Sequence, residues 1–471
     1  MTSLRLLAAT ALAATLAVPA LAQDHAGREQ HTPAPQPDEQ PDHSQMDHSQ
    51  MGHDESVAPQ ESELDDYCPP AICDKALRRV PHDFEMPDLS QLPPPRYVEA
   101  SGTARLPGAE GMMPGLHRDL GDDWMGMAHG YLWGVYTDQG GPRGDDKAYV
   151  QSMAMLMAQK NFDGARLQLK AMLSAEPLMD ARGYPNLFAT GETAHGEPLV
   201  DRQHPHDLFM ELAARGDVYL GEGTHAFVYG GPVGEPALGP PAFMHRASAR
   251  LNPEAPITHH WFDSTHITYG VVTAGVAGSA WQVEASAFRG EEPDEDRWDI
   301  EAPRLDSWSV RATLTPSPNW ALQVSHGRLE QPEALHPGVD EARTTASVHY
   351  NSGRGLSATA AFSSKDRLPG PTLTAWLAEA SWDFAERHTL FGRIENAEND
   401  ELFPDHADPL HDQAFRVSKF QAGYAYTLPL GPFGLSLGGS VAAFAKPDAL
   451  DAAYGSSPIG YTLFAKLTLG R

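Results

Sequence analysis

The sequence predicts an all-β protein, a transmembrane antiparallel β-barrel of about sixteen strands (about 14 to 18) with long external loops. The chain begins like an exported protein, its second part alternates apolar and polar residues, and short turns alternate with long polar loops. Along the 471 residues we expect a signal peptide at 1–22, a disordered or irregular Met/His/Pro-rich periplasmic segment at 23–123 that is a candidate partial plug, and the barrel at 124–471.

The first residues, MTSLRLLAATALAATLAVPALAQ, combine one early cation at Arg5 with a short apolar run and small residues before Gln23. This pattern is typical of a cleaved secretory signal. No later stretch approaches the roughly 20 apolar residues of a membrane helix, which argues against an inner-membrane protein. We therefore expect the outer membrane of a Gram-negative bacterium, with the N-terminal segment in the periplasm.

A tether at residues 41–55, PDHSQMDHSQMGHDE, repeats Asp-His-Ser-Gln-Met and holds too little apolar surface to order itself. Imidazole suits Cu(II) and Zn(II), whereas the soft thioether selects Cu(I). The pattern favours a metal-capture segment over an incidental polar linker. Its candidate ligands are His43, Met46, His48, Met51 and His53.

Composition restricts the partners. A formal net charge of −29 without any run of Lys or Arg argues against nucleic acid. The two cysteines, Cys68 and Cys73, favour a local disulfide in an oxidising compartment, and a metal-thiolate pair is the alternative. We expect contacts with outer-membrane lipid and lipopolysaccharide, and periplasmic metal-handling proteins are candidate partners. The oligomeric state stays open.

Strands are indicated by period-two alternation, as in WALQVSHG, where Trp320, Leu322 and Val324 share one face. The same pattern recurs at 164–173, 281–288, 308–314, 420–428 and 460–471. A charge at the lipid midplane costs about 2 to 4 kcal/mol. The charged residues predicted to face the lumen are therefore Arg166, Lys170, Glu284 and Arg311.

The joins between strands favour a membrane barrel over a secreted all-β enzyme, because only the barrel has a reason to keep every short turn at one end. Short turns at 161–164, 221–223, 277–279, 315–319, 351–355, 385–387 and 429–432 alternate with long loops. Two of those loops, 177–205 and 232–264, hold prolines, glycines and aromatic residues. We expect them to pack together and fold inward.

A second methionine and histidine group lies just before and inside the first predicted strand. Its members are Met112, Met113, His117, Met125, Met127 and His129. Met125, Met127 and His129 alternate and so share one face near the predicted periplasmic mouth, where they are candidate metal ligands. Met153, Met155 and Met157 repeat this alternation one strand later. Lumen-facing thioethers would line a path for Cu(I), but contact with lipid is the favoured interpretation of these faces.

The third group lies in and beside the two longest loops. Its candidate ligands for a nitrogen and oxygen metal site are His204, His206, Asp207, His245, His259, His260, Asp263 and His266. A rigid loop network is the favoured alternative, because no spacing matches the helical histidine pair of a zincin. Ser264 beside His266 does not predict a hydrolase, since neighbours in a strand face opposite sides and no nucleophile elbow surrounds the serine.

Several strings resemble an uncharacterised family of proteobacterial outer-membrane β-barrel proteins over most of residues 124–345. They are HGYLWGVYTDQGGPRGDDK, RQHPHDLFMELA, GEPALGPPAFMHR and NPEAPITHHWFDSTHITYG. This resemblance implies location and fold only. Separately, the Met/His-rich tether is similar to the N-terminal segments of copper-resistance outer-membrane proteins of the PcoB/CopB type, which implies copper handling.

The predicted function is metal binding or tolerance, with copper as the metal, by an outer-membrane barrel whose periplasmic tether captures ions. The alternative is a general or substrate-selective diffusion porin with no metal role, and an outer-membrane hydrolase is a distant third. We expect no enzymatic activity and no tightly bound cofactor, with copper ions as the candidate ligand.

A peptide of residues 41–55 should bind Cu(I) through Met46 and Met51, and Cu(II) through its three histidines. Replacing both methionines with leucine should weaken Cu(I) binding and leave Cu(II) binding nearly unchanged. Cu(II) binding should fall below about pH 6.5, because a protonated imidazole cannot coordinate. Titration of the two peptides checks this, and equal Cu(I) affinities would contradict a role for the methionines.

Overall fold

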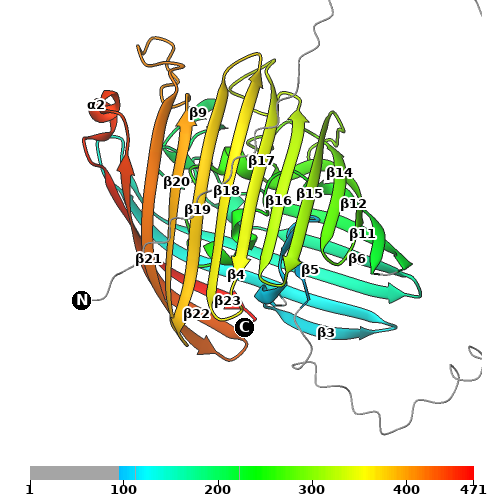
Figure 1. Ribbon diagram of the computed structural model, residues 1–471. Helices are drawn as coiled ribbons and strands as arrows, with labels where there is room; N and C mark the ends of the chain where they lie inside the picture. Colours follow the sequence, from blue (N-terminus) through cyan, green and yellow to red (C-terminus); the bar gives the residue numbers. More distant parts are fainter. Residues whose placement is uncertain (1–94, 112, 222, 471) are drawn as a thin grey trace, which may run out of the picture. The chain divides into compact units, whose positions relative to one another are not determined.

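The computed structural model describes residues 95–111, 113–221 and 223–470, which contain a closed antiparallel β-barrel (Figure 1). Sixteen strands form the ring, which confirms the predicted fold class. They are β4 (Trp124–Gln139), β5 (Asp146–Phe162), β6 (Ala165–Leu173), β11 (Phe209–Gly221), β12 (Thr224–Gly234), β13 (Thr268–Ala277), β14 (Trp281–Phe288), β15 (Ser307–Ser317), β16 (Trp320–Leu329), β17 (Asp340–Asn351), β18 (Leu356–Leu368), β19 (Thr372–Ala385), β20 (His388–Asn399), β21 (Phe415–Leu430), β22 (Phe433–Ala445) and β23 (Ile459–Leu469).

The ring closes where the last strand, β23, pairs with β4, so that Gly460 lies opposite Gln139 and Leu469 opposite Gly130. A seventeenth strand, β3 (Leu116–Gly121), pairs with the remaining part of the same β4 edge, from Ala128 to Trp124. Strand β3 therefore continues the line of β23. Two segments from opposite ends of the barrel sequence together cover one edge.

The two ends of the barrel differ as expected from the turn lengths. At one end, here called the turn end, each join between neighbouring strands is short, as at 163–164 and 431–432. The other end, here called the loop end, carries the long segments and the short helix α2 (Asp451–Tyr454) (Figure 1). None of the helices in the described residues is long and apolar enough to cross a lipid bilayer.

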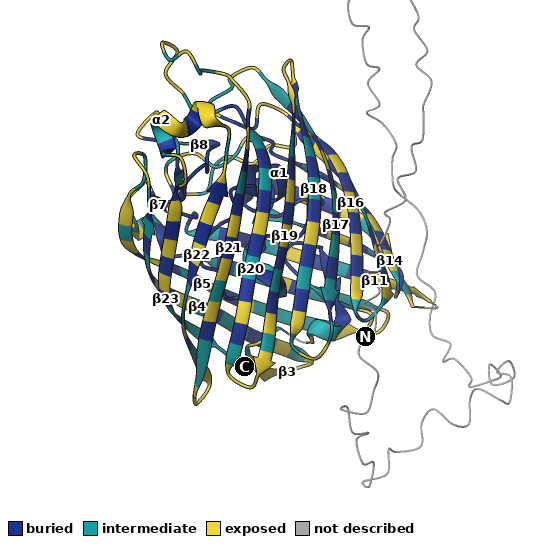
Figure 2. Ribbon diagram, turned by 60° about the vertical axis from the view of Figure 1, so that its left-hand side comes forward, coloured by how far each residue is buried: buried dark blue, intermediate teal, exposed yellow. Residues whose placement is uncertain are grey.

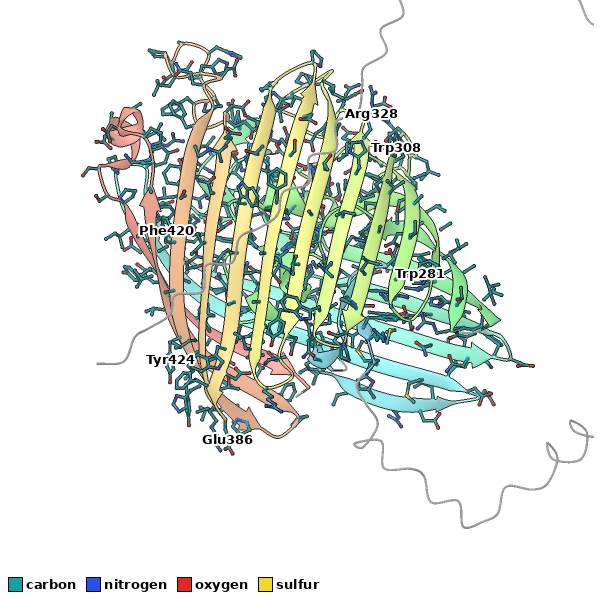
Figure 3. All side chains as sticks on the ribbon, viewed as in Figure 1. Trp281, Trp308, Arg328, Glu386, Phe420 and Tyr424 are labelled. Carbon is teal, nitrogen blue, oxygen red and sulfur yellow. The ribbon has the colours of Figure 1, made fainter. Side chains whose placement is uncertain are left out.

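Buried and exposed residues alternate along the wall strands, as the alternating colours of Figure 2 show. In β16, Trp320 and Val324 are 42% and 56% exposed, whereas Ala321 is fully buried. Outward aromatic rings gather near both rims: the Trp320 and Tyr350 rings lie 4.6 Å apart near the turn end, and Trp308 lies near the loop end (Figure 3). An apolar surface between aromatic rims is typical of a wall that contacts lipid.

The inward face is charged, and the four lumenal charges predicted from the sequence are confirmed. Arg166 pairs with Asp217 and Glu99, and the Lys170 ammonium donates to the carbonyl oxygen of Gly102. Glu284 pairs with Arg311.

The prediction that Met153, Met155 and Met157 contact lipid is wrong, because these side chains point into the lumen. Met153 and Met155 are 2% and 4% exposed, whereas the outward Leu156 is 60% exposed. The stretch SMAMLMAQ is apolar on both faces, so its alternation showed which residues share a face but not which face meets lipid.

Residues 95–111 line the lumen at the turn end as a short hairpin. It consists of β1 (Tyr97–Glu99), β2 (Arg105–Pro107) and the 3₁₀ turn η2 (Gly108–Glu110). The hairpin is tied to the wall: Gln282 donates to the Thr103 carbonyl oxygen at 2.8 Å, and Arg105 donates to the carbonyl oxygen of Gly278 at 2.8 Å. Part of the segment before the barrel therefore occupies the lumen.

Replacing Arg311 with leucine should destabilise the barrel by about 3 to 5 kcal/mol, because Glu284 would be left buried without its partner. The pair lies 2.9 Å apart, and both side chains are almost completely buried. The matched control is Arg328→Leu, which removes a solvent-exposed partner of Asp340 (Figure 3) and should cost less than about 1 kcal/mol.

The measurement for both variants is the free energy of unfolding from urea titration in lipid vesicles. Equal losses in the two variants would contradict the importance of the lumenal pair. Removing both charges, in R311L/E284L, should recover much of the loss, since no unpaired charge is then buried.

Candidate metal centre in the lumen

Two long segments from the loop end, 174–208 and 235–267, fold into the lumen and pack together, as predicted. The first contains η3 (Glu176–Leu178), β7 (Tyr184–Pro185), β8 (Glu192–Ala194), β9 (Glu197–Leu199) and β10 (Arg202–Gln203). The second contains η4 (Phe243–His245), η5 (Ala247–Ala249), α1 (His259–Phe262) and η6 (Ser264–His266). Asn186 donates to the Ala255 carbonyl oxygen at 3.1 Å, and the Ala255 N–H donates to the Tyr184 hydroxyl at 3.0 Å.

Five buried histidines meet where these segments touch. The rings of His259 and His260 lie 5.3 Å apart, and the His204 ring lies 6.0 Å from the first and 6.1 Å from the second. The ring of His266 lies 5.2 Å from that of His259 and 5.3 Å from that of His206. Because two loops far apart in sequence supply them, the cluster depends on the way the lumen is filled.

Each of these imidazoles is oriented by a hydrogen bond at its Nδ1 atom. Carboxylates accept from three of them: Glu176 from His206 at 2.9 Å, Asp263 from His259 at 2.8 Å and Glu292 from His260 at 3.2 Å. Backbone carbonyl oxygens accept from the other two, Pro205 from His204 and Asp263 from His266. A neutral imidazole that donates from Nδ1 presents its Nε2 lone pair, which is the arrangement of a metal-binding histidine.

Four of the Nε2 atoms, those of His204, His206, His260 and His266, are buried and have no hydrogen-bond partner among the described residues. The Nε2 atom of His204 lies 3.1 Å from a Glu192 oxygen, but the angle does not allow a hydrogen bond. Leaving a buried polar atom unpaired costs about 1 to 3 kcal/mol. These four Nε2 atoms are therefore available to bind a ligand.

Three histidines, His204, His259 and His260, each bring one ring nitrogen within 4.8 Å of the others. Glu192 and Glu292 form a second, overlapping group with His260 under the same limit. Imidazole nitrogen and carboxylate oxygen together suit Zn(II), Cu(II) and related divalent ions. Because the two groups share His260, whose Nδ1 is engaged by Glu292, the arrangement can hold one ion.

The surrounding charges set the protonation states. Burial lowers the pKa of His204 and of His266, which favours the neutral, ligating form. Burial also opposes the charge on His260, but the neighbouring Glu292 carboxylate outweighs it and raises the pKa of His260 to about 9. A metal that binds there at neutral pH must displace a proton.

The two aspartates among the predicted ligands are engaged elsewhere. Asp207 pairs with Arg297 at 3.2 Å, and Asp263 pairs with Arg246 at 3.1 Å while it accepts from His259. These two carboxylates therefore hold the loops and the His259 ring and do not face the unpaired Nε2 atoms. The predicted loop network and the predicted histidine cluster thus occur together.

The expectation that 263–266 lies in a strand is wrong, because α1 and η6 occupy this stretch and β13 begins only at Thr268. Ser264 is not placed as a nucleophile in the described contacts, since Arg343 donates to its hydroxyl oxygen at 2.9 Å.

The remaining candidates lie elsewhere. His245, His129 and Met127 face the turn-end half of the lumen, whereas Met125, in the β3–β4 hairpin, is 48% exposed and lines neither of the turn-end cavities. The predictions for the tether and for the cysteines concern residues outside the described ones, namely His43, Met46, His48, Met51, His53, Cys68 and Cys73. Met112 also lies outside the described residues.

Sequence reasoning missed the carboxylates Glu176, Glu192 and Glu292, which orient or adjoin the histidines. Glu292 lies in the acidic loop stretch EEPDED, whose position between two predicted strands was the available signal. Glu176 and Glu192 carry no local pattern, because they reach the cluster only through the fold of their loop.

No protein-family model matches the sequence, and no curated protein matches it. Among solved structures, OmpF of Salmonella typhi in complex with daunomycin aligns with a TM-score of 0.50 at 7% identity, covering 75% of this chain and all of that chain. OprB of Pseudomonas putida aligns with a TM-score of 0.47 at 10% identity, covering 74% of this chain and 94% of the other. The likeness to OmpF supports a porin-like barrel fold. The similarity of the tether to PcoB/CopB-type proteins stays a prediction.

Gly191→Ala should displace His260, because a Cβ at residue 191 would lie 2.6 Å from the imidazole ring and the φ of +110° already disfavours a side chain. The ring would move away from Glu292, so the pKa of His260 should fall from about 9. The control, Gly196→Ala, has a similarly positive φ of +75° but no atom within 4 Å.

Histidine-labelled NMR titration of the two variants measures this pKa. A fall in G191A alone is the expected result, whereas the same change in G196A would indicate general loop strain instead of a steric contact with His260.

Proposed function

We propose that this chain is a porin-like outer-membrane protein of a Gram-negative bacterium, with its turn end toward the periplasm. The apolar outer wall, the aromatic rims and the uniformly short joins at the turn end support this location. We also propose that the N-terminal segment lies in the periplasm. No catalytic role is assigned.

Within that class, we propose that the lumen binds divalent transition-metal ions and that the protein handles copper. The observation that carries this proposal is the convergence of three buried histidines, His204, His259 and His260, two of which, His204 and His260, have an Nε2 atom without a hydrogen-bond partner among the described residues. Copper is favoured because imidazole suits Cu(II) and the tether adds thioethers that select Cu(I). Periplasmic metal-handling proteins are the proposed partners.

Access from the turn end supports the proposal. A vestibule of about 510 Å³ lies at this end and is lined in part by Tyr131, Arg250 and Lys466. The same three residues also line a crevice of about 20 Å³ that reaches His206 and Glu176. Such a crevice has room for about one water molecule, so it suits a single ion better than an organic solute.

A diffusion channel without a metal role is the second candidate. The fold likeness to a porin and the size of the vestibule favour it. In that case the inward loops would act only as a constriction, and the histidines would be part of their packing.

Binding of Cu(II) and Zn(II) to the purified full chain separates the two candidates. The tether histidines His43, His48 and His53 are first replaced with alanine, so that the tether contributes no imidazole, and the lumenal variants are compared in this common background. In that background His204→Ala/His259→Ala should lower the affinity by more than the roughly 10- to 100-fold that follows loss of a residue that merely orients a ligand. The control is His326→Ala, an outward histidine that contacts Thr344.

Affinity should also rise with pH up to about 9, because below that pH the metal competes with the proton of His260. Unchanged affinity in the double variant would overturn the metal site. Sugar uptake by vesicles that contain the protein, combined with unaltered copper tolerance in a deletion strain, would then favour the diffusion channel.

A further inference from the structure

A second group of metal-binding side chains lies at the turn end of the lumen. Eight methionines pack together in one cluster on and beside β4, β5, β6 and β11, and all of them are buried or half-buried. They are Met113, Met127, Met153, Met155, Met157, Met172, Met210 and Met244. The histidine cluster uses none of them.

The sheet register arranges sulfur and imidazole in two rows. In the first, Met127 lies opposite His117 on one side and opposite Met157 on the other. In the second, Met155 lies between His129 and Met172. Directly opposite residues have Cβ atoms about 4.5 to 5.5 Å apart, so neighbouring side chains in a row reach one another.

These side chains surround a space instead of filling it. A cavity of about 220 Å³ is lined by Met113, Met127, Met155 and Met157 together with His117 and His245. Methionine is flexible and normally closes such gaps. The buried Nε2 atom of His245 has no hydrogen-bond partner in the described ranges. The cavity thus offers four thioethers and an open imidazole nitrogen.

The charges around the cavity fit a monovalent cation. Lys170 lines it, but its ammonium donates to the carbonyl oxygens of Ala100 and Gly102. The Glu211 carboxylate also lines it, accepts from the Tyr229 hydroxyl and has no ion pair within the described residues. Glu99, the remaining charged residue of the lining, pairs with Arg166. The Glu211 carboxylate offsets the charge of Lys170, so the lining adds no excess positive charge that would repel a monovalent cation held by neutral sulfur donors.

We propose that this methionine cavity binds a thiophilic monovalent cation, Cu(I) or Ag(I), through the thioethers of Met113, Met127, Met155 and Met157 with His245. Soft sulfur ligands select such ions over the divalent ions that suit imidazole and carboxylate. The ion enters and leaves without a change of oxidation state. Met113 and His245 also line the vestibule, so the cavity opens toward the turn end.

Ag(I) is the probe, because it does not change oxidation state in air. The full chain is used with Met46 and Met51 replaced by leucine, so that the tether contributes no thioether. In this background M127L/M157L should lose about one bound Ag(I) per chain and the silver–sulfur scattering seen by X-ray absorption. Met210→Leu is the matched control, since Met210 belongs to the same cluster but does not line the cavity.

Unchanged Ag(I) stoichiometry in M127L/M157L would overturn the site. His204→Ala/His259→Ala should keep its Ag(I) while losing Cu(II), so failure of this proposal is distinguishable from failure of the histidine site. A second measurement needs no variant in the cavity: Ag(I) should protect Met127 and Met157 from peroxide oxidation, as read by mass spectrometry. Equal oxidation with and without Ag(I) would also overturn the proposal.

Discussion

The lumen of this barrel is organised by charge pairing between the wall and the loops that fill it. Arg246 pairs with Asp263 of its own loop and with Glu379 of β19, which in turn pairs with Arg393 of β20. Lys419 of β21 pairs with Glu254 of the same loop. Breaking one such buried pair leaves an uncompensated charge, so these contacts act together to fix where the loop lies. Asp263 also holds the His259 ring, which couples the position of the histidines to this network.

This constraint explains why the interior differs so much from the exterior. The outer wall needs only apolar side chains, because lipid is its solvent, and the period of two supplies them. Inside the closed barrel, buried charges and backbone groups need ion-pair and hydrogen-bond partners. Loop segments with little regular structure supply those partners. A metal site can be built on such loops only if they are held rigidly, and the ion pairs provide that rigidity.

The sequence was sufficient to predict the wall and insufficient for the contacts inside it. Alternation of apolar and polar residues placed Arg311 and Glu284 in the lumen, because a charged side chain that faced the lipid would be costly. It failed at Met155 because both faces of that strand are apolar. The histidines were recognised by residue type, yet the pairing of His260 with Glu292 depends on two loops meeting inside the barrel, and no local pattern reports that contact.

The shared edge of β4 has a consequence for assembly of the chain during synthesis. Strand β3 pairs with Trp124 to Ala128 through a tight turn at Asp122 and Asp123, so this local hairpin can form without β23. Only the part of β4 from Gly130 to Gln139 then stays unpaired until β23 joins it. An unpaired edge invites association with other chains, and its length sets that risk. The hairpin therefore shortens the unpaired β4 edge that a newly exported, still open barrel exposes to chaperones and to other chains.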